Sequence, residues 1–354
     1  MEEIHNNYMK LRDWVPMDKL DWKTLSRNPN AIHILEQNMN KVNLVGLSEN
    51  PNAIHILEKN LGKVHWTGLS SNPNAIYILE KNLYKVNWYN LSSNPNAIFI
   101  LEKNLDKVIW KDLCNNRNPN LVHILEHNLD KLDKECWYIL SENPSAIPIL
   151  EKHVDKINWL KLSYNPNAIH MLEQNLDKVN WTELSLNPNA IHILEQNLDK
   201  VNWGCLSYNP NSIHILEKNL DKMKGVCWYN LSYKRNAIHI LEKNLDKVYW
   251  NMLSQNPNAI SILEKNLDKV NWDLLCFNPN AIHILEKNLD KCGEECWKRL
   301  CSNPNIFTYD YEAMKTAMYN DDGFVEELMA NRFHPKNMVK WTDWGFESQL
   351  DEDK

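Results

Sequence analysis

A column of histidine residues is the first feature of this sequence that could carry chemistry. In most copies of a repeated segment the residue between two isoleucines is histidine, so stacked copies would form a ladder of potential metal ligands. The same column also holds Tyr77, Phe99, Pro148 and Ser261, and a metal or catalytic array does not tolerate such replacements. We therefore interpret the histidines as packing or surface residues and expect no metal site. Their positions are His33, His55, His123, His170, His192, His214, His239 and His283.

The cysteines are a second candidate for chemistry. Cys292, Cys296 and Cys301 lie close together in sequence, and Cys276 could approach from the previous copy. A tetrahedral zinc site needs four such ligands, and the usual paired CxxC spacing is missing. We expect ordinary core thiols, and all eight cysteines reduced in an intracellular protein.

Columns of glutamate and lysine would supply acid and base groups. A residue repeated in nearly every copy serves the structure, however, whereas catalysis needs a unique constellation in a pocket. The sequence contains no such constellation, so we predict a non-enzymatic protein with no catalytic residues and no cofactor. The asparagine after Glu-Lys is expected to hydrogen-bond the turn between helices. These columns include Glu36, Glu58, Glu80 and Glu102, then Lys41, Lys63, Lys85 and Lys107, then Asn60, Asn82 and Asn104.

All these columns belong to one segment, NPNAIHILEKNLDKVNW, which recurs with a step of 22 residues. A constant step of this length indicates one small unit copied side by side. The clearest marker is a tryptophan column with one leucine substitute. Its members are Trp22, Leu44, Trp66, Trp88, Trp110, Trp137, Trp159, Trp181, Trp203, Trp228, Trp250, Trp272 and Trp297.

Each copy is predicted to contain two helices. Asn50 is a suitable helix N-cap and Pro51 a suitable first residue, and the apolar residues up to Val64 follow at helical spacing, which indicates the longer helix. A second helix of one or two turns should begin at the tryptophan, capped by a preceding Asn or Asp in seven copies. The capping residues are Asp21, Asn43, Asn87, Asn158, Asn180, Asn202 and Asn271.

Stacking of such units predicts an all-α solenoid of about thirteen helix-turn-helix repeats, shaped as an open rod or superhelix. We expect an N-terminal cap over 1–20, the repeat solenoid over 21–304, and a C-terminal helical cap and tail over 305–354. A leucine-rich repeat has a similar period. It needs a short strand, usually followed by an asparagine ladder, whereas the apolar spacing here is helical.

Three copies carry about three extra residues before the tryptophan, and in each the preceding residue becomes cysteine: Cys136, Cys227 and Cys296. In another copy Lys234-Arg235 replaces Asn-Pro, so its helix lacks the usual cap. The insertions suggest an adjustment of curvature or a lip on one edge.

Charge and hydropathy exclude two classes of partner. The net charge is −7, and lysines alternate with acidic residues, whereas a nucleic-acid-binding protein needs a basic face. No segment has the length and apolar character of a signal peptide or membrane span. We expect an intracellular protein that binds neither nucleic acid nor membrane.

The repeated sequence, with LSxNPN between copies, resembles that of the short Asn-Pro-Asn helical-repeat proteins of giant DNA viruses. The resemblance covers about residues 11–304. The segment from Phe324 to Trp341, with its Phe-His-Pro turn, resembles a terminal element of proteins from those viruses. The resemblance implies a viral repeat protein that acts by binding, in the host cytoplasm or in the virion, and it supplies no catalytic residues.

Positions that vary between copies are the best candidates for a binding surface, because the scaffold does not dictate them. The residue before NPN, or its equivalent, is large and mostly aromatic in six successive copies, and the pair after each tryptophan also varies, as in Tyr229-Asn230. Neighbouring copies would align these side chains into a protein-binding stripe. Alternatively, they tuck into the turn of the next copy. The six residues are Tyr164, Leu186, Tyr208, Tyr233, Gln255 and Phe277.

The sequence therefore favours a scaffold that binds a viral or host protein along an extended surface. The alternative is a structural protein that associates with itself or with virion proteins. A more distant alternative is an enzyme whose site lies in the C-terminal segment around His334.

Overall fold

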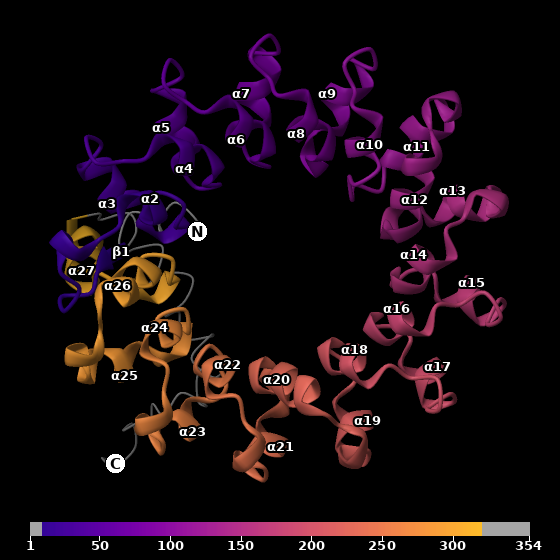
Figure 1. Ribbon diagram of the computed structural model, residues 1–354. Helices are drawn as coiled ribbons and strands as arrows, with labels where there is room; N and C mark the ends of the chain where they lie inside the picture. The colour runs from indigo at the N-terminus through magenta and orange to yellow at the C-terminus, as the bar shows by residue number, and fades with distance from the viewer. Residues whose placement is uncertain (1–8, 321–354) are drawn as a thin grey trace, which may run out of the picture.

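In the computed structural model of the protein, residues 9–320 are described. It is an all-α repeat solenoid in which two concentric rows of short helices surround a central opening (Figure 1). In the described residues no helix is long and apolar enough to cross a bilayer.

The tryptophan helices form the inner row. They are α2 (Trp22–Leu25), α4 (Leu44–Glu49), α6 (Trp66–Ser71), α8 (Trp88–Ser93), α10 (Trp110–Leu113), α12 (Lys134–Glu142), α14 (Trp159–Tyr164), α16 (Trp181–Leu186), α18 (Trp203–Tyr208), α20 (Gly225–Tyr233), α22 (Trp250–Ser254), α24 (Trp272–Leu275) and α26 (Glu294–Leu300). From α4 to α26, each contacts the next along the row. All seven predicted Asn and Asp caps are confirmed, since each side chain accepts a hydrogen bond from the backbone three residues later.

The NPN segments lead into the outer row. It comprises α3 (Ile32–Gln37), α5 (Ile54–Glu58), α7 (Ile76–Lys81), α9 (Ile98–Glu102), α11 (Leu121–Glu126), α13 (Ile147–Lys152), α15 (Ile169–Glu173), α17 (Ile191–Glu195), α19 (Ile213–Lys218), α21 (Ile238–Glu242), α23 (Ile260–Glu264) and α25 (Ile282–Lys287). A last helix, α27 (Tyr311–Asn320), follows the repeats.

Short 3-10 turns flank many outer helices. Those before them are η2 (Pro29–Ala31), η3 (Pro95–Ala97), η5 (Pro144–Ala146), η8 (Arg235–Ala237) and η11 (Pro279–Ala281), with η13 (Pro304–Ile306) in the last copy. Those after them are η4 (Leu129–Lys131), η6 (Val154–Lys156), η7 (Leu220–Lys222), η9 (Leu245–Lys247), η10 (Leu267–Lys269) and η12 (Leu289–Lys291).

The outer helix is shorter than predicted. In the copy beginning at Asn50, the α-helix covers only Ile54–Glu58, because Asn50 holds the first residues in a turn by accepting from the Asn52 amide at 3.0 Å. Asn60 ends the helix by donating to the Ile56 carbonyl at 2.8 Å, which confirms the predicted role of its column. The prediction of one longer and one shorter helix per copy is therefore wrong.

The core lies between the two rows as one continuous layer. The third residue after each tryptophan and the Ala and Leu of the outer element are fully buried, for example Leu69, Ala75 and Leu79 at 0% exposure. Each short helix buries apolar residues against both its own copy and its neighbours, which is how a solenoid stabilises elements too short to be stable alone.

A buried asparagine ladder links successive copies. The first Asn of NPN donates to two carbonyls of the preceding copy; Asn50, for example, contacts the Ser26 and Asn28 oxygens at 3.1 and 3.0 Å. The second Asn donates to the preceding copy's proline carbonyl, as Asn52 does to Pro29 at 3.1 Å. The repeats contain no strand within the described residues, so the leucine-rich alternative fails on that point although a ladder of the same residue type is present.

The solenoid closes into a ring, and the prediction of an open rod or superhelix is wrong. Strand β1 (Met9–Leu11) pairs antiparallel with β2 (Phe307–Tyr309), with Lys10 opposite Thr308. The asparagine ladder also crosses the junction, since Asn28 donates to the Cys301 and Asn303 carbonyls at 3.0 and 3.3 Å. Figure 1 shows the first and last helices side by side. We call this junction the closure seam.

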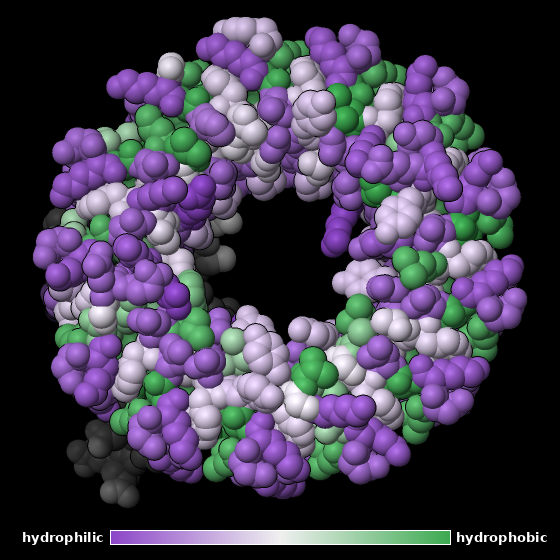
Figure 2. All heavy atoms as spheres, viewed as in Figure 1, coloured by the Kyte–Doolittle hydropathy of each residue, from purple (hydrophilic) through white to green (hydrophobic). Residues whose placement is uncertain are grey.

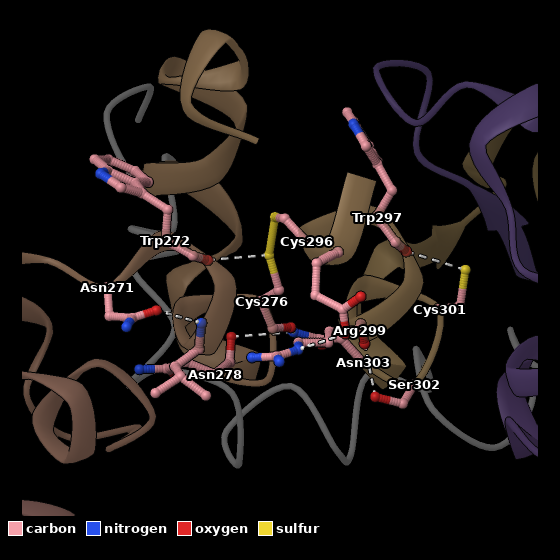
Figure 3. The surroundings of a disulfide bond; sticks show 12 residues. Asn271, Trp272, Cys276, Asn278, Cys296, Trp297, Arg299, Cys301, Ser302 and Asn303 are labelled. Carbon is pink, nitrogen blue, oxygen red and sulfur yellow. Dashed lines mark hydrogen bonds and ion pairs between the residues drawn. A yellow bond between two sulfur atoms is a disulfide. The ribbon is translucent and has the colours of Figure 1, made fainter. Parts of the chain in front are cut away.

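The three insertions lengthen inner helices at their N-terminal ends. The helices α12 and α20 have nine residues each and α26 has seven, whereas the inner helices of the other copies have four to six. One insertion helix carries a disulfide, since Cys296 of α26 is bonded to Cys276 at the end of α24 (Figure 3). The expectation that all cysteines are free thiols is therefore wrong for this pair, whose members the stacking brings together from neighbouring copies.

Candidate protein-binding site

The exposed face of the inner helices borders the central opening. Within each helix the third and fourth residues after the tryptophan are buried against the outer row, as Leu162 and Ser163 are at 0% exposure. The first, second and fifth residues lie on the opposite side of the helix. Because the core separates the two rows, this opposite side faces the opening.

The predicted binding residues lie on this face, in an arc that follows consecutive helices. Tyr164, Leu186, Tyr208 and Tyr233 are the last residues of α14, α16, α18 and α20. Gln255 directly follows α22, and Phe277 is the second residue after α24. Tyr208 and Tyr233 are 61% and 57% exposed. We call the residues Tyr164, Leu186, Tyr208, Tyr229, Tyr233, Gln255 and Phe277 the aromatic arc. In Figure 2 pale and green atoms gather over α18 and α20 at the edge of the opening.

Side chains of neighbouring copies meet along the arc. The Arg299 guanidinium of α26 lies 5.6 Å from the Phe277 ring centre, and the Tyr229 and Tyr249 rings are 5.5 Å apart in an edge-on arrangement. Leu186 and Gln255 are half-buried. The alternative in which all these side chains tuck into the next turn does not describe Tyr208 and Tyr233, which are mostly exposed.

A groove of 680 Å³ crosses the arc at α18, α20 and α22. Tyr208, Tyr229 and Tyr233 line it together with Met252 and Gln255. Five predicted residues, counting Asn230 discussed next, therefore come together from three copies.

Asn230 lies in this groove and is only 5% exposed. Its amide nitrogen donates to Ser207 Oγ at 2.7 Å and to the Gly204 carbonyl at 3.3 Å. Its Oδ1 atom is buried and accepts no hydrogen bond from the described residues. A buried acceptor left unpaired costs about 1–3 kcal/mol, so this position is not optimised for stability.

Lys234 takes the place of the ladder asparagine beside the groove. Its ammonium group donates to the Asn209 carbonyl and to Ser212 Oγ, the latter at 3.0 Å. Ser212 occupies the column that is alanine in most copies, so a second substitution accommodates the lysine. Arg235, in the proline position, is exposed and forms no ion pair with any residue that the structure describes.

Burial lowers the pKa of Lys234 from its ordinary 10.5 to about 8. Below pH 8 the lysine is charged in both the folded and unfolded states, and the folded state bears the full cost of burying that charge. Between pH 8 and 10.5 only the unfolded state keeps the proton, so the free energy of unfolding rises with pH.

Lys234→Asn should restore the ladder and stabilise the ring by about 2–3 kcal/mol at pH 7, since one pKa unit corresponds to about 1.4 kcal/mol. The gain should shrink as the pH rises from 8 towards 10.5. Urea unfolding of both proteins at about pH 7, 9 and 10 measures it. Lys243→Asn, at an exposed position, is the control. A gain that does not change with pH would contradict the buried-charge explanation.

Both signs of charge occur around the opening. Arg27 pairs with Glu49 at 2.9 Å, and Lys161 pairs with Glu142 at 2.5 Å, each between neighbouring copies. Among the described residues, the lining of the opening therefore carries both signs and does not form the continuous positive surface that nucleic-acid backbones require. The charged residues at lining positions are Lys23, Arg27, Lys111, Lys161, Lys298 and Arg299, and Glu49, Asp112, Glu142, Glu183 and Asp273.

The other columns have structural roles in the described residues. Most column histidines are exposed on outer helices beside a glutamate of the preceding copy, as His55 is beside Glu36 at 2.7 Å. No group of three His, Cys, Asp or Glu side chains suited to a metal occurs in the part of the chain that the structure describes. Lysines of the next copy lie over tryptophan rings, as Lys85 lies 5.1 Å from the Trp66 ring centre. The segment around His334 lies outside the described residues.

Comparison with protein-family models, with curated proteins and with solved structures finds no match to this chain.

Proposed function

We propose that this protein is a non-enzymatic ring scaffold that binds another protein through the aromatic arc. The observation that carries the proposal is the groove across α18, α20 and α22. There, exposed tyrosine rings lie beside the buried Asn230 oxygen and the Arg235 guanidinium, neither of which is paired within the described residues. Exposed tyrosine on a rigid helix gives a large contact area at a small entropic cost, and tyrosine and arginine are enriched among residues that dominate binding energy.

The chemistry of the groove suggests what the partner presents. Apolar side chains of the partner would contact the Tyr208, Tyr229 and Tyr233 rings. A carboxylate would pair with Arg235. An acidic segment of a protein with apolar side chains supplies both groups. The mixed charge of the remaining lining is the reason that we propose neither nucleic acid nor membrane as a partner.

The resemblance to giant-virus repeat proteins extends this proposal to location. It favours a partner of viral or host origin, bound in the cytoplasm of an infected cell or in the virion. We propose no catalysis because the repeated Glu, Lys and His side chains are used in contacts between copies.

Replacing Tyr164, Tyr208, Tyr233 and Phe277 together by serine tests the proposal. Affinity for a partner captured by the wild-type ring should fall by roughly 100-fold or more, because aromatic hot-spot residues contribute about 2 kcal/mol or more each. The measurement is a titration of the purified partner by calorimetry. Thermal unfolding should change little, because the four side chains lie on the solvent side of the inner helices.

The matched control replaces aromatic residues of similar exposure on the outer row. Tyr77 and Phe99 are 60% and 58% exposed, on α7 and α9, far from the opening. Tyr77→Ser with Phe99→Ser should leave the affinity unchanged. Equal affinity of the wild type and the quadruple variant, both folded, would reject the aromatic arc as the binding surface.

The same outer aromatics support the alternative of self-association. The side chains of Tyr77, Tyr84 and Phe99 are exposed on neighbouring copies of the outer row. If rings assemble through them, the sedimentation coefficient should rise with concentration, and Tyr77→Ser with Phe99→Ser should abolish that rise. A sedimentation coefficient independent of concentration would leave the aromatic arc as the better-supported surface.

A further inference from the structure

A fixed contact joins two positions of successive copies. The fourth residue after the tryptophan is usually serine, and its hydroxyl accepts a hydrogen bond from the residue that precedes the next copy's tryptophan. Ser163 Oγ, for example, accepts from the Asn180 amide at 2.9 Å, and Ser48 Oγ accepts from the His65 amide at 3.0 Å. We call these the serine position and the pre-tryptophan position.

The disulfide Cys276–Cys296 links these two positions covalently. Cys276 occupies the serine position after Trp272, and its sulfur lies 3.3 Å from the Trp272 carbonyl oxygen, where the serine hydroxyls lie in other copies (Figure 3). Cys296 occupies the pre-tryptophan position of a copy with an insertion. The insertion places this residue inside α26 and not at its cap, and its side chain is fully buried against α24.

The same two positions hold cysteine once more. Cys114 occupies the serine position after Trp110, at the end of α10. Cys136 occupies the pre-tryptophan position of α12, which also carries the insertion. Both are free thiols whose side chains are buried, with 0% and 2% exposure, on helices that contact each other, and each thiol influences the pKa of the other.

We propose that Cys114 and Cys136 are a second thiol–disulfide site that covalently links neighbouring copies when the protein folds in the presence of a disulfide oxidant. With a low-molecular-weight disulfide RSSR, one cysteine thiolate displaces RS⁻ to give a mixed disulfide. The second thiolate then displaces the other RS⁻. The two cysteines are oxidised, RSSR is reduced to two RSH, and the two protons of the cysteine thiols end on the RSH products.

The site should form during folding and not in the finished ring. Burial raises the pKa of both thiols, which keeps the reactive thiolate scarce once the two copies have stacked. While the copies are still assembling, both sulfurs are accessible to the oxidant.

The test is refolding of reduced, denatured full-length protein in a glutathione redox buffer, followed by alkylation and peptide mass spectrometry. We expect two disulfides, Cys276–Cys296 and Cys114–Cys136. Alkylation of Cys114 and Cys136 under conditions that oxidise Cys276–Cys296 would overturn the proposal, as would pairing of Cys114 with any other cysteine. The cysteines expected to be alkylated are Cys205, Cys227, Cys292 and Cys301.

Two variants test the positional rule itself. Cys114→Ser restores the usual residue of its position, so the ring should fold while Cys136 becomes alkylated. Ser207→Cys places a thiol in the serine position that faces Cys227. Cys227 is buried in α20, the remaining helix with an insertion. A new disulfide from this introduced thiol to Cys227 is expected, and failure of this bond to form in a folded ring would remove the argument from equivalent positions.

Discussion

Lys10→Cys combined with Thr308→Cys should join the two ends of the repeat array covalently and raise the free energy of unfolding by about 5 kcal/mol. The two residues are directly opposite in the β1–β2 pair, where side chains on one face approach to about 5 Å. A cross-link that closes a loop of nearly the whole chain removes a large part of the entropy of the unfolded state, which sets the upper limit of about 5 kcal/mol. The midpoint of guanidinium unfolding, with and without reductant, measures the effect.

The reduced double variant and each single variant are the controls. They should unfold at the wild-type midpoint, because the side chains of Lys10 and Thr308 are both partly exposed. Peptide mapping of the oxidised double variant should recover a disulfide between its two introduced cysteines, and that protein should migrate faster than the reduced form on a denaturing gel. An array with open ends would form no such bond within one molecule.

Asn165→Ala, the exchange of one buried ladder asparagine, should lower the free energy of unfolding by about 3–6 kcal/mol. Asn165 is fully buried and makes three hydrogen bonds: it donates to the Ser141 and Asn143 carbonyls at 3.1 and 3.0 Å, and it accepts from the Asn167 amide at 3.0 Å. Its removal leaves three buried backbone groups unpaired, each at a cost of about 1–3 kcal/mol. Urea unfolding followed by circular dichroism measures the loss.

Asn167→Ala is the matched control two residues away. Asn167 is exposed and donates one hydrogen bond, to the Pro144 carbonyl at 3.1 Å, so its loss should cost below about 1 kcal/mol. Equal effects of the two exchanges would mean that the buried ladder does not hold the copies together.

The local structure of the repeat could be predicted from sequence because it depends on neighbouring residues. The Asn and Asp caps before the tryptophans satisfy free amides of the same helix, so residue type and position suffice to identify them. The length of the outer helix could not be predicted in this way. The side chain of its first asparagine accepts from the amide two residues later, as Asn50 does from Asn52, and also donates to carbonyls of the preceding copy. The contacts with the preceding copy cannot be recognised in the sequence of one copy.

Ring closure depends on the sum of the small rotations between successive copies, and no single residue determines that sum. Each of thirteen copies must contribute one thirteenth of a full turn, and a slightly different packing of the inner helices would give an open superhelix with the same sequence pattern. The strands that pair at the closure seam have three residues each, which is too short for an alternating pattern to be recognised.

The candidate site was only partly visible in the sequence. Variation between copies pointed to Tyr208, Tyr233 and Tyr229, since the scaffold does not dictate these positions. The same variation could not show that Asn230 is buried with an unpaired oxygen, because this depends on contact with Ser207 of the previous copy. Ser212 stands where most copies have alanine, and this difference is visible in the sequence. Its connection with Lys234 can be recognised only in the structure, where the two side chains form a hydrogen bond.

The closed ring also bears on stoichiometry. Thirteen is a prime number, so no dimeric, trimeric or tetrameric ligand can share a rotation axis with this circle of inner helices and meet equivalent surfaces all around it. The helices are moreover unlike one another where they border the hole, with Tyr208, Tyr229 and Tyr233 gathered on the neighbouring helices α18 and α20. A molecule bound there would lie off the ring axis, with one copy bound per ring in one orientation. The rest of the inner surface would remain unoccupied.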